Sequence, residues 1–220
     1  MKINYWADYA CPYCYIGEVR IKRAIEELGL SDKLHLQMRA YQLDPNASQV
    51  AEGDMATRLA NKYGITKKEA AERVSGIKEY AIEDGLDFDY TKVRFTNTLD
   101  AHRLSKFAME HLSIKQMADF RMAIYKAYFE EYLELANHEV LLKIAEEAGL
   151  NIDQVAECLD SSQYKEEVLK DQQKARAEEV KGVPYFVIGQ VTVPGAMSVD
   201  TFKDIIKQEV ENNHLYEDEE

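Results

Sequence analysis

The chain has 220 residues, a formal net charge of −13 and a sequence pI near 4.9. An acidic surface repels phosphate backbones and anionic lipid headgroups, so the composition argues against nucleic-acid and membrane-surface partners. The apolar runs are too short for a bilayer crossing, which needs about 20 apolar residues, and the N-terminal stretch lacks the apolar core of a secretion signal. We therefore expect a cytoplasmic protein.

The first predicted elements form a parallel βαβ unit. Residues 2–7 alternate in polarity and predict a short strand, whereas residues 12–29 repeat their apolar side chains at helical spacing. Pro12 suits the first helical turn because it has no amide proton to lose there. Residues 33–43 alternate again, so a second strand follows a crossover helix.

Strand patterns are absent from the long middle of the chain. From about residue 51 to residue 180 the periodicity is almost wholly helical. Strand character returns at residues 185–193, where two β-branched runs flank Gly189 and Gln190 and predict a hairpin. A last amphipathic helix is expected at residues 199–212.

The order βαβ, helical block, ββα predicts an α/β domain that is interrupted by a large all-helical insertion. Both ends of the chain supply strands to one sheet, which favours an insertion over two tandem domains. We therefore predict a discontinuous domain of residues 1–48 and 181–220 and a helical insertion domain of residues 49–180.

The motif CPYC, from Cys11 to Cys14, lies where the first strand gives way to the first helix. At such a junction the unpaired backbone N–H groups and the helix dipole favour negative charge. This position lowers the pKa of a thiol from about 8.5 to roughly 3.5–7.5, which makes a thiolate available near neutral pH. Cys14 lies one helical turn further on and can resolve a mixed disulfide formed on Cys11.

Two other interpretations of the cysteine pair stay open. A structural zinc site needs four ligands, normally with a second Cys/His pair at short spacing, and neither Cys158 nor the five scattered histidines supply one. The CxxC spacing also arises by chance, in which case both thiols would be inert and buried, as we expect for Cys158. We expect no metal site and no tightly bound cofactor.

The second informative stretch is KGVPYFVI, which puts Val183 and Pro184 at the start of a predicted strand. Proline in this position is usually a turn or edge residue with a trans bond. A cis bond would instead present the Val183 backbone beside the thiols, where it could pair with an extended substrate strand.

Four separated blocks are similar in sequence and order to one known family: CPYCYIG, FTNTLDAHRL, IYKAYFEE with LLKIAEEAGL, and GVPYFVI. They resemble the DsbA-like thioredoxin-fold family, specifically its cytosolic FrnE-type branch, over nearly the whole chain. The resemblance implies a thioredoxin-like fold and a dithiol–disulfide oxidoreductase or isomerase. Cys11 would be the nucleophile, Cys14 the resolving thiol and Pro184 a cis proline facing them. The residues that would support this site are Pro12, Tyr13 and Val183.

The chain departs from the family pattern in two segments. Tyr13 stands where the branch commonly has Trp, and residues between the cysteines tune thiolate stability. The stretch VTVPGAMS replaces a pattern that usually continues Gly-Ala-Gln, and we expect Gly195 and Ala196 within it to contact substrate. The resemblance also suggests that Asn97 and His102 line a groove between the insertion and the thiols. If the resemblance is set aside, the sequence pattern predicts that Asn97 is a helix N-cap and that His102 is a polar residue on a packed helix.

The leading hypothesis is a thiol–disulfide oxidoreductase that acts on protein or small-molecule thiols and disulfides. One alternative is a glutathione-dependent isomerase or transferase of the 2-hydroxychromene-2-carboxylate isomerase type, although those sequences typically carry Ser in place of the first cysteine. Another alternative is a non-enzymatic adaptor of DsbA-like fold that delivers a client to a protease.

Overall fold

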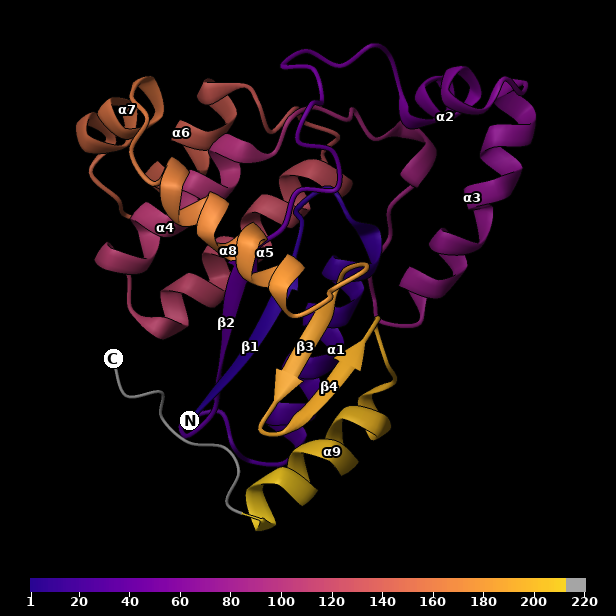
Figure 1. Ribbon diagram of the computed structural model, residues 1–220. Coiled ribbons are helices and arrows are strands. Elements are labelled where there is room, and N and C mark those ends of the chain that lie inside the picture. Colours follow the sequence, from indigo (N-terminus) through magenta and orange to yellow (C-terminus); the bar gives the residue numbers. More distant parts are fainter. Residues whose placement is uncertain (213–220) are drawn as a thin grey trace. The chain divides into compact units, whose positions relative to one another are not determined.

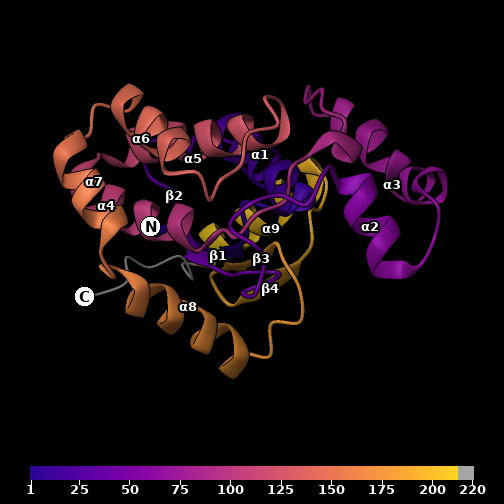
Figure 2. The same ribbon diagram turned by 90° about the horizontal axis from the view of Figure 1, so that it is seen from above.

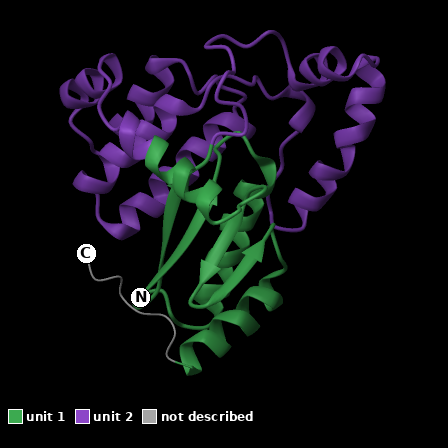
Figure 3. Cartoon of the chain, in the orientation of Figure 1, with its two compact units in different colours: residues 1–41, 169–220 green, residues 42–168 purple. Residues whose placement is uncertain are grey.

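A computed structural model describes residues 1–212, and the chain divides into two compact units (Figure 3). Unit 1 contains residues 1–41 and the chain from residue 169 onward, and unit 2 contains residues 42–168. Residues 213–220, the end of the predicted discontinuous domain, lie outside the described residues. None of the helices in residues 1–212 combines the length and the apolar content that a membrane crossing requires.

Unit 1 is built on a four-stranded sheet with the strand order β2-β1-β3-β4 (Figure 1). Strand β1 (Lys2–Ala7) pairs in parallel with β2 (His35–Ala40), and helix α1 (Pro12–Glu27) connects them. Strand β3 (Tyr185–Ile188) pairs antiparallel with both β1 and β4 (Val191–Pro194). The predicted βαβ unit and hairpin are confirmed, and the two ends of the chain share one sheet.

Different helices cover the two faces of this sheet. Neighbouring side chains of a strand point to opposite faces, so Tyr5 and Trp6 of β1 contact different helices. On one face Tyr5 stacks on Phe186, which contacts Phe202 of α9 (Val199–Glu211). On the other face Trp6 packs with Ala175 of α8 (Lys165–Ala177). Figure 2 shows α8 on one side of the sheet and α1 and α9 on the other.

Helix α8 begins in unit 2 and continues in unit 1, although the sequence assigned the chain up to residue 180 to the insertion. The Asp171 side chain accepts a hydrogen bond from the Ala40 backbone N–H at 2.8 Å, and its backbone carbonyl accepts one from Trp6 Nε1 at 2.9 Å. These bonds fasten the helix to β1 and β2. The boundaries between the two units accordingly lie after residues 41 and 168, whereas the boundaries predicted from the sequence lie after residues 48 and 180.

Unit 2 consists of helices and loops, as the predicted helical block requires. The helices are α2 (Met55–Tyr63), α3 (Lys67–Ile82), α4 (Leu99–His111), α5 (Ile114–Phe129), α6 (His138–Glu147) and α7 (Ile152–Asp160), with a short 3-10 turn at Tyr90–Lys92. Local capping explains several of their starts. Thr66 and Glu69 form a capping box at the start of α3, and the Asn137 side chain caps α6. The predicted α/β fold with a large helical insertion is confirmed.

Candidate functional site

The turn between β1 and α1 places Cys11 at the N-cap of the helix. Its backbone is extended, with φ −95° and ψ 116°, and Pro12 follows at the first helical position. The Cys11 N–H donates to the Asp8 carbonyl at 3.0 Å, and the Cys11 carbonyl accepts the N–H of Cys14 at 3.0 Å. The helix therefore begins at the motif, so the positive end of its dipole coincides with the cysteine pair, as the sequence predicted.

Both cysteines are free thiols and both are buried, but not to the same extent. Cys11 retains 5% of its exposure and Cys14 none, while Tyr13 between them is exposed. Burial raises the pKa of the Cys14 thiol well above its ordinary value, and a hydrogen bond with Cys11 and the charge of Cys11 raise it further. Cys14 is therefore a protonated thiol at neutral pH, and Cys11 is the less completely buried residue of the pair.

The Val183–Pro184 peptide bond is cis, which is the alternative that sequence analysis connected with the thiols. The Cys11 thiol donates a hydrogen bond to the Val183 carbonyl, with a sulfur–oxygen distance of 3.5 Å. The Gly195 N–H donates to the Pro184 carbonyl at 2.8 Å. Two segments that are 172 residues apart in sequence thus meet at the motif.

Helix α1 lies close to this proline because residue 17 is a glycine. A Cβ atom at Gly17 would stand 3.1 Å from Pro184 Cγ and 3.4 Å from Ala196 Cβ. Arg20, almost one turn further along α1, is buried and donates from Nη1 to the Ala196 carbonyl at 3.0 Å. Gly195 and Ala196 are therefore brought beside Pro184. Neither Gly17 nor Arg20 was among the predicted site residues, although a glycine inside a helical pattern can indicate close packing.

Asn97 and His102 belong to unit 2, and their predicted place beside the thiols stays a prediction. Asn97 is buried and accepts the Leu99 N–H at 2.8 Å, and its Nδ2 donates to the carbonyls of Pro45 and Ala47. Thr98, not Asn97, occupies the N-cap position of α4, so the predicted cap is wrong by one residue. His102 is buried on α4, which agrees with the simpler interpretation of a packed helix.

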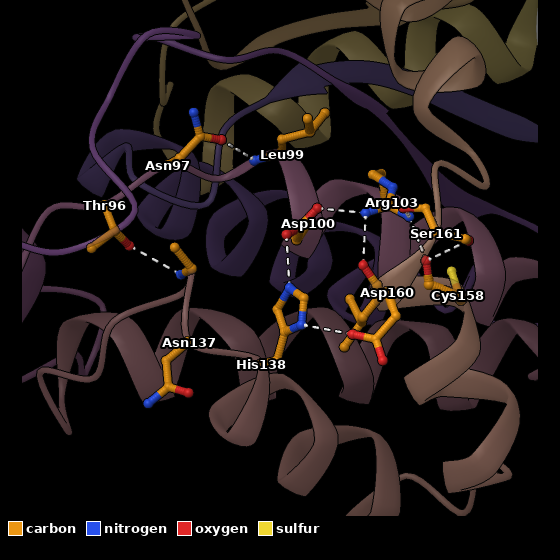
Figure 4. A network of polar contacts seen from close by, with 12 residues as sticks. Thr96, Asn97, Leu99, Asp100, Arg103, Asn137, His138, Cys158, Asp160 and Ser161 are labelled. Carbon is orange, nitrogen blue, oxygen red and sulfur yellow. Dashed lines mark hydrogen bonds and ion pairs between the residues drawn. The ribbon is translucent and has the colours of Figure 1, made fainter.

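A polar network in unit 2 surrounds the third cysteine (Figure 4). The buried Arg103 donates to Asp100 Oδ1 at 2.6 Å, to the Ser161 carbonyl at 2.7 Å and to the Cys158 carbonyl. These carbonyls lie at the C-terminal end of α7, where the helix supplies no backbone donor. Burial raises the pKa of the Cys158 thiol. No group of three or more His, Cys, Asp and Glu residues within residues 1–212 is arranged to hold a metal ion.

Comparison with known proteins assigns the family. The model of the DSBA-like thioredoxin domain matches residues 2–207. The chain belongs to this family. It is 25% identical over 210 residues to the uncharacterized protein YwbO of Bacillus subtilis (strain 168), covering 94% of this chain and 96% of YwbO. The DSBA-like domain is also similar to the solved structure of the probable DsbA oxidoreductase SCO1869 from Streptomyces coelicolor, with a TM-score of 0.87, 26% identity and coverage of 99% and 93%.

Two more distant structures share the fold of this DSBA-like domain. One is 2-hydroxychromene-2-carboxylate isomerase, with a TM-score of 0.71, 14% identity and coverage of 97% and 98%. The other is the cytosolic disulfide reductase DsbM from Pseudomonas aeruginosa, with a TM-score of 0.61, 16% identity and coverage of 96% and 100%. DsbM has also been solved with GSH. The family includes disulfide oxidoreductases, and two free thiols at a helix start are an arrangement suited to disulfide exchange.

Proposed function

We propose that the protein is a thiol–disulfide oxidoreductase in which Cys11 attacks a substrate disulfide and Cys14 releases the product. The carrying observation is the Cys11 sulfur at the N-cap of α1, 3.5 Å from the carbonyl of a cis-proline segment. Both cysteines are buried, but only Cys11 keeps any exposure, and this supports their different roles because the nucleophile must meet the substrate and the resolving thiol need not.

Each exchange step forms one disulfide and breaks another. The Cys11 thiolate attacks a substrate sulfur, the substrate disulfide breaks, and the leaving thiolate takes a proton from solvent. Cys14 then loses its proton and attacks the Cys11 sulfur, which releases the second substrate thiolate and leaves an intramolecular disulfide. The raised pKa of Cys14 favours this order, because a protonated Cys14 does not compete as a nucleophile in the first step.

The substrate is a protein or small-molecule disulfide whose extended backbone pairs with Val183, next to the cis bond. Gly195 and Ala196 border the same position through the Gly195–Pro184 hydrogen bond. Glutathione is the thiol that we propose returns the pair to the dithiol form, supported by the solved complex of the related DsbM fold with GSH. A reducing cytoplasm is the compartment where such a cycle would run.

Trapping of the mixed disulfide tests this function. The Cys14→Ala variant should accumulate a covalent adduct with insulin, because attack proceeds and resolution does not. Cys158→Ala serves as the matched control, since its thiol is buried in unit 2, and should turn over like the parent. Adducts would be counted on non-reducing gels and by mass spectrometry. Adduct formation that persists in Cys11→Ala would contradict the assignment of the nucleophile.

Glutathione-dependent isomerisation is a second candidate, favoured by the fold that the chain shares with 2-hydroxychromene-2-carboxylate isomerase over 97% of its length. That chemistry requires no resolving thiol. Isomerase turnover that survives in Cys14→Ser, together with no insulin reduction by the parent, would place this candidate first. Loss of all turnover in Cys14→Ser with retained adduct formation would exclude it.

A further inference from the structure

Arg20 is a buried cation of unit 1 that contacts the turn beside Pro184. It lies on α1 and retains 6% of its exposure, and its Nη1 donates to the Ala196 carbonyl at 3.0 Å. A charged donor in the protein interior forms a stronger hydrogen bond than a neutral donor does. None of the exchange steps proposed above uses this side chain.

The turn that Arg20 contacts is bonded in turn to Pro184. Residues 195–197 lie between β4 and α9, and Gly195 has φ +85°, a conformation that favours glycine. The Gly195 N–H donates to the Pro184 carbonyl at 2.8 Å, and the Met197 N–H donates to the Gly195 carbonyl at 3.2 Å. The turn is therefore held from two sides, by α1 through Arg20 and by the start of β3 through Pro184.

Val183 connects this arrangement to the thiol. Its carbonyl accepts the hydrogen bond of the Cys11 thiol, with a sulfur–oxygen distance of 3.5 Å. Its half-buried side chain packs against the core cluster around Trp6. The backbone of Val183 is consequently the part with which a substrate chain can pair.

We propose that Arg20 is a positioning residue for peptide disulfides. It fixes the turn of residues 195–197, and with it Pro184, so that the Val183 backbone pairs with an extended peptide while Cys11 attacks the peptide's disulfide. This inference rests on the proposed function and narrows the substrate to disulfides that a peptide backbone carries. Backbone pairing recognises the extended chain itself, so a disulfide without a backbone gains nothing from Arg20.

The contacts that hold the thiol do not involve Arg20. The Cys11 N–H donates to the Asp8 carbonyl at 3.0 Å, and the Cys11 carbonyl accepts the Cys14 N–H at 3.0 Å. Loss of the Arg20 donor should therefore displace the turn and leave the start of α1 in place. Reactions that need only the Cys11 sulfur should then respond differently from reactions that also need the paired backbone.

Two disulfides with the same leaving group separate these reactions. One is Ellman's reagent, which has no peptide backbone, and the other is a short peptide whose single cysteine is joined to thionitrobenzoate. In proteins that carry Cys14→Ala, the Cys11 thiolate attacks one sulfur and the probe disulfide breaks. Coloured thionitrobenzoate leaves in both cases because its thiol has the lower pKa. Stopped-flow absorbance gives the second-order rate constant for each probe.

Arg20→Met should lower the rate constant for the peptide about tenfold and that for Ellman's reagent by less than about twofold, because only the peptide uses the positioned backbone. Lys22→Met is the matched control, since Lys22 is half-buried on the same helix and its substitution removes the same charge. This control should react like the parent with both probes. Equal losses for the two probes in Arg20→Met, or a loss for neither, would refute the positioning role.

Gly195→Ala disturbs the same turn without a change in α1. Alanine is strained at φ +85°, whereas nothing lies within 4 Å of its Cβ position, so the substitution affects the backbone of the turn and not its packing. It should also slow the peptide selectively, and it replaces Arg20→Met if that variant does not fold. A folded Gly195→Ala protein with the parent's ratio of the two rate constants would contradict the proposal. A parent that reacts with neither probe would instead refute the proposed function itself.

Discussion

Gly17 shows how a single residue controls the spacing of the catalytic segments. It lies on α1, three residues after Cys14, and its missing side chain lets the helix approach Pro184 and Phe186. A Cβ atom at this position would lie 3.1 Å from Pro184 Cγ, which is too short for an unstrained contact. Any side chain here would have to displace the cis-proline segment or the helix.

Gly17→Ala is therefore expected to lower the free energy of unfolding by about 1–3 kcal/mol through overpacking. The rate of disulfide exchange should also fall, because Pro184 moves relative to Cys11. Gly76→Ala is the matched control, since Gly76 lies inside α3 with nothing near its Cβ position. That control should raise stability by roughly 0.5–1 kcal/mol from helix propensity alone. Urea unfolding measures both, and equal stabilisation of the two variants would contradict the close packing at Gly17.

At the scale of the elements, buried polar residues hold helices in place. Arg103 on α4 satisfies carbonyls at the end of α7 and pairs with Asp100, which also accepts a hydrogen bond from His138 of α6 at 2.9 Å. Asp171 has a comparable role between α8 and β2. Such residues contribute mainly because their removal leaves buried partners without hydrogen bonds.

Arg103→Ala should therefore be strongly destabilising. We expect a loss of about 3–5 kcal/mol in the free energy of unfolding, since the half-buried Asp100 and several buried carbonyls lose their donor together. Arg73→Ala is the comparison, because Arg73 is exposed on α3, and its effect should stay within about 0.5 kcal/mol. Chemical unfolding followed by circular dichroism measures the difference. A similar small effect in both variants would show that water replaces the Arg103 contacts.

For the whole molecule, the buried thiols should make the pH dependence of the free energy of unfolding differ between the reduced and oxidised forms. The pKa values of Cys14 and Cys158 are raised above the ordinary value of 9.0, chiefly by burial. The folded state therefore holds these protons more tightly than the unfolded state does. Their stabilising contribution is complete below pH 9.0 and is lost as the pH rises from 9.0 through the raised values.

The reduced protein should consequently lose stability more steeply above pH 9.0 than the oxidised protein does, because the disulfide removes the Cys14 titration from both the folded and unfolded states. Urea midpoints measured from about pH 7 to about pH 10.5 in both redox states test this expectation. Cys14→Ala in reducing buffer should follow the flatter curve. Parallel curves for the reduced and oxidised forms would contradict the buried-thiol explanation.

The order of elements, the parallel βαβ unit, the hairpin and the position of the cysteine pair at a helix start could all be predicted from the amino-acid sequence. These features depend on residues that are close in sequence, such as the alternation in β1, Pro12 at the first helical position and Thr66 with Glu69 at the start of α3. The short 3-10 turn at Tyr90–Lys92 was missed, since three residues carry no periodic pattern.

Four features could not be predicted from the sequence and depend on the folded chain. They are the cis state of the Val183–Pro184 bond, the burial of Asp8, the close approach at Gly17 and the assignment of most of α8 to unit 1. Each of these features depends on partners that are distant in sequence. Asp171 bonds Ala40 across 131 residues, and the Cys11 thiol meets Val183 across 172. Burial and hydrogen bonding of this kind are properties of the packed chain, so no local pattern encodes them.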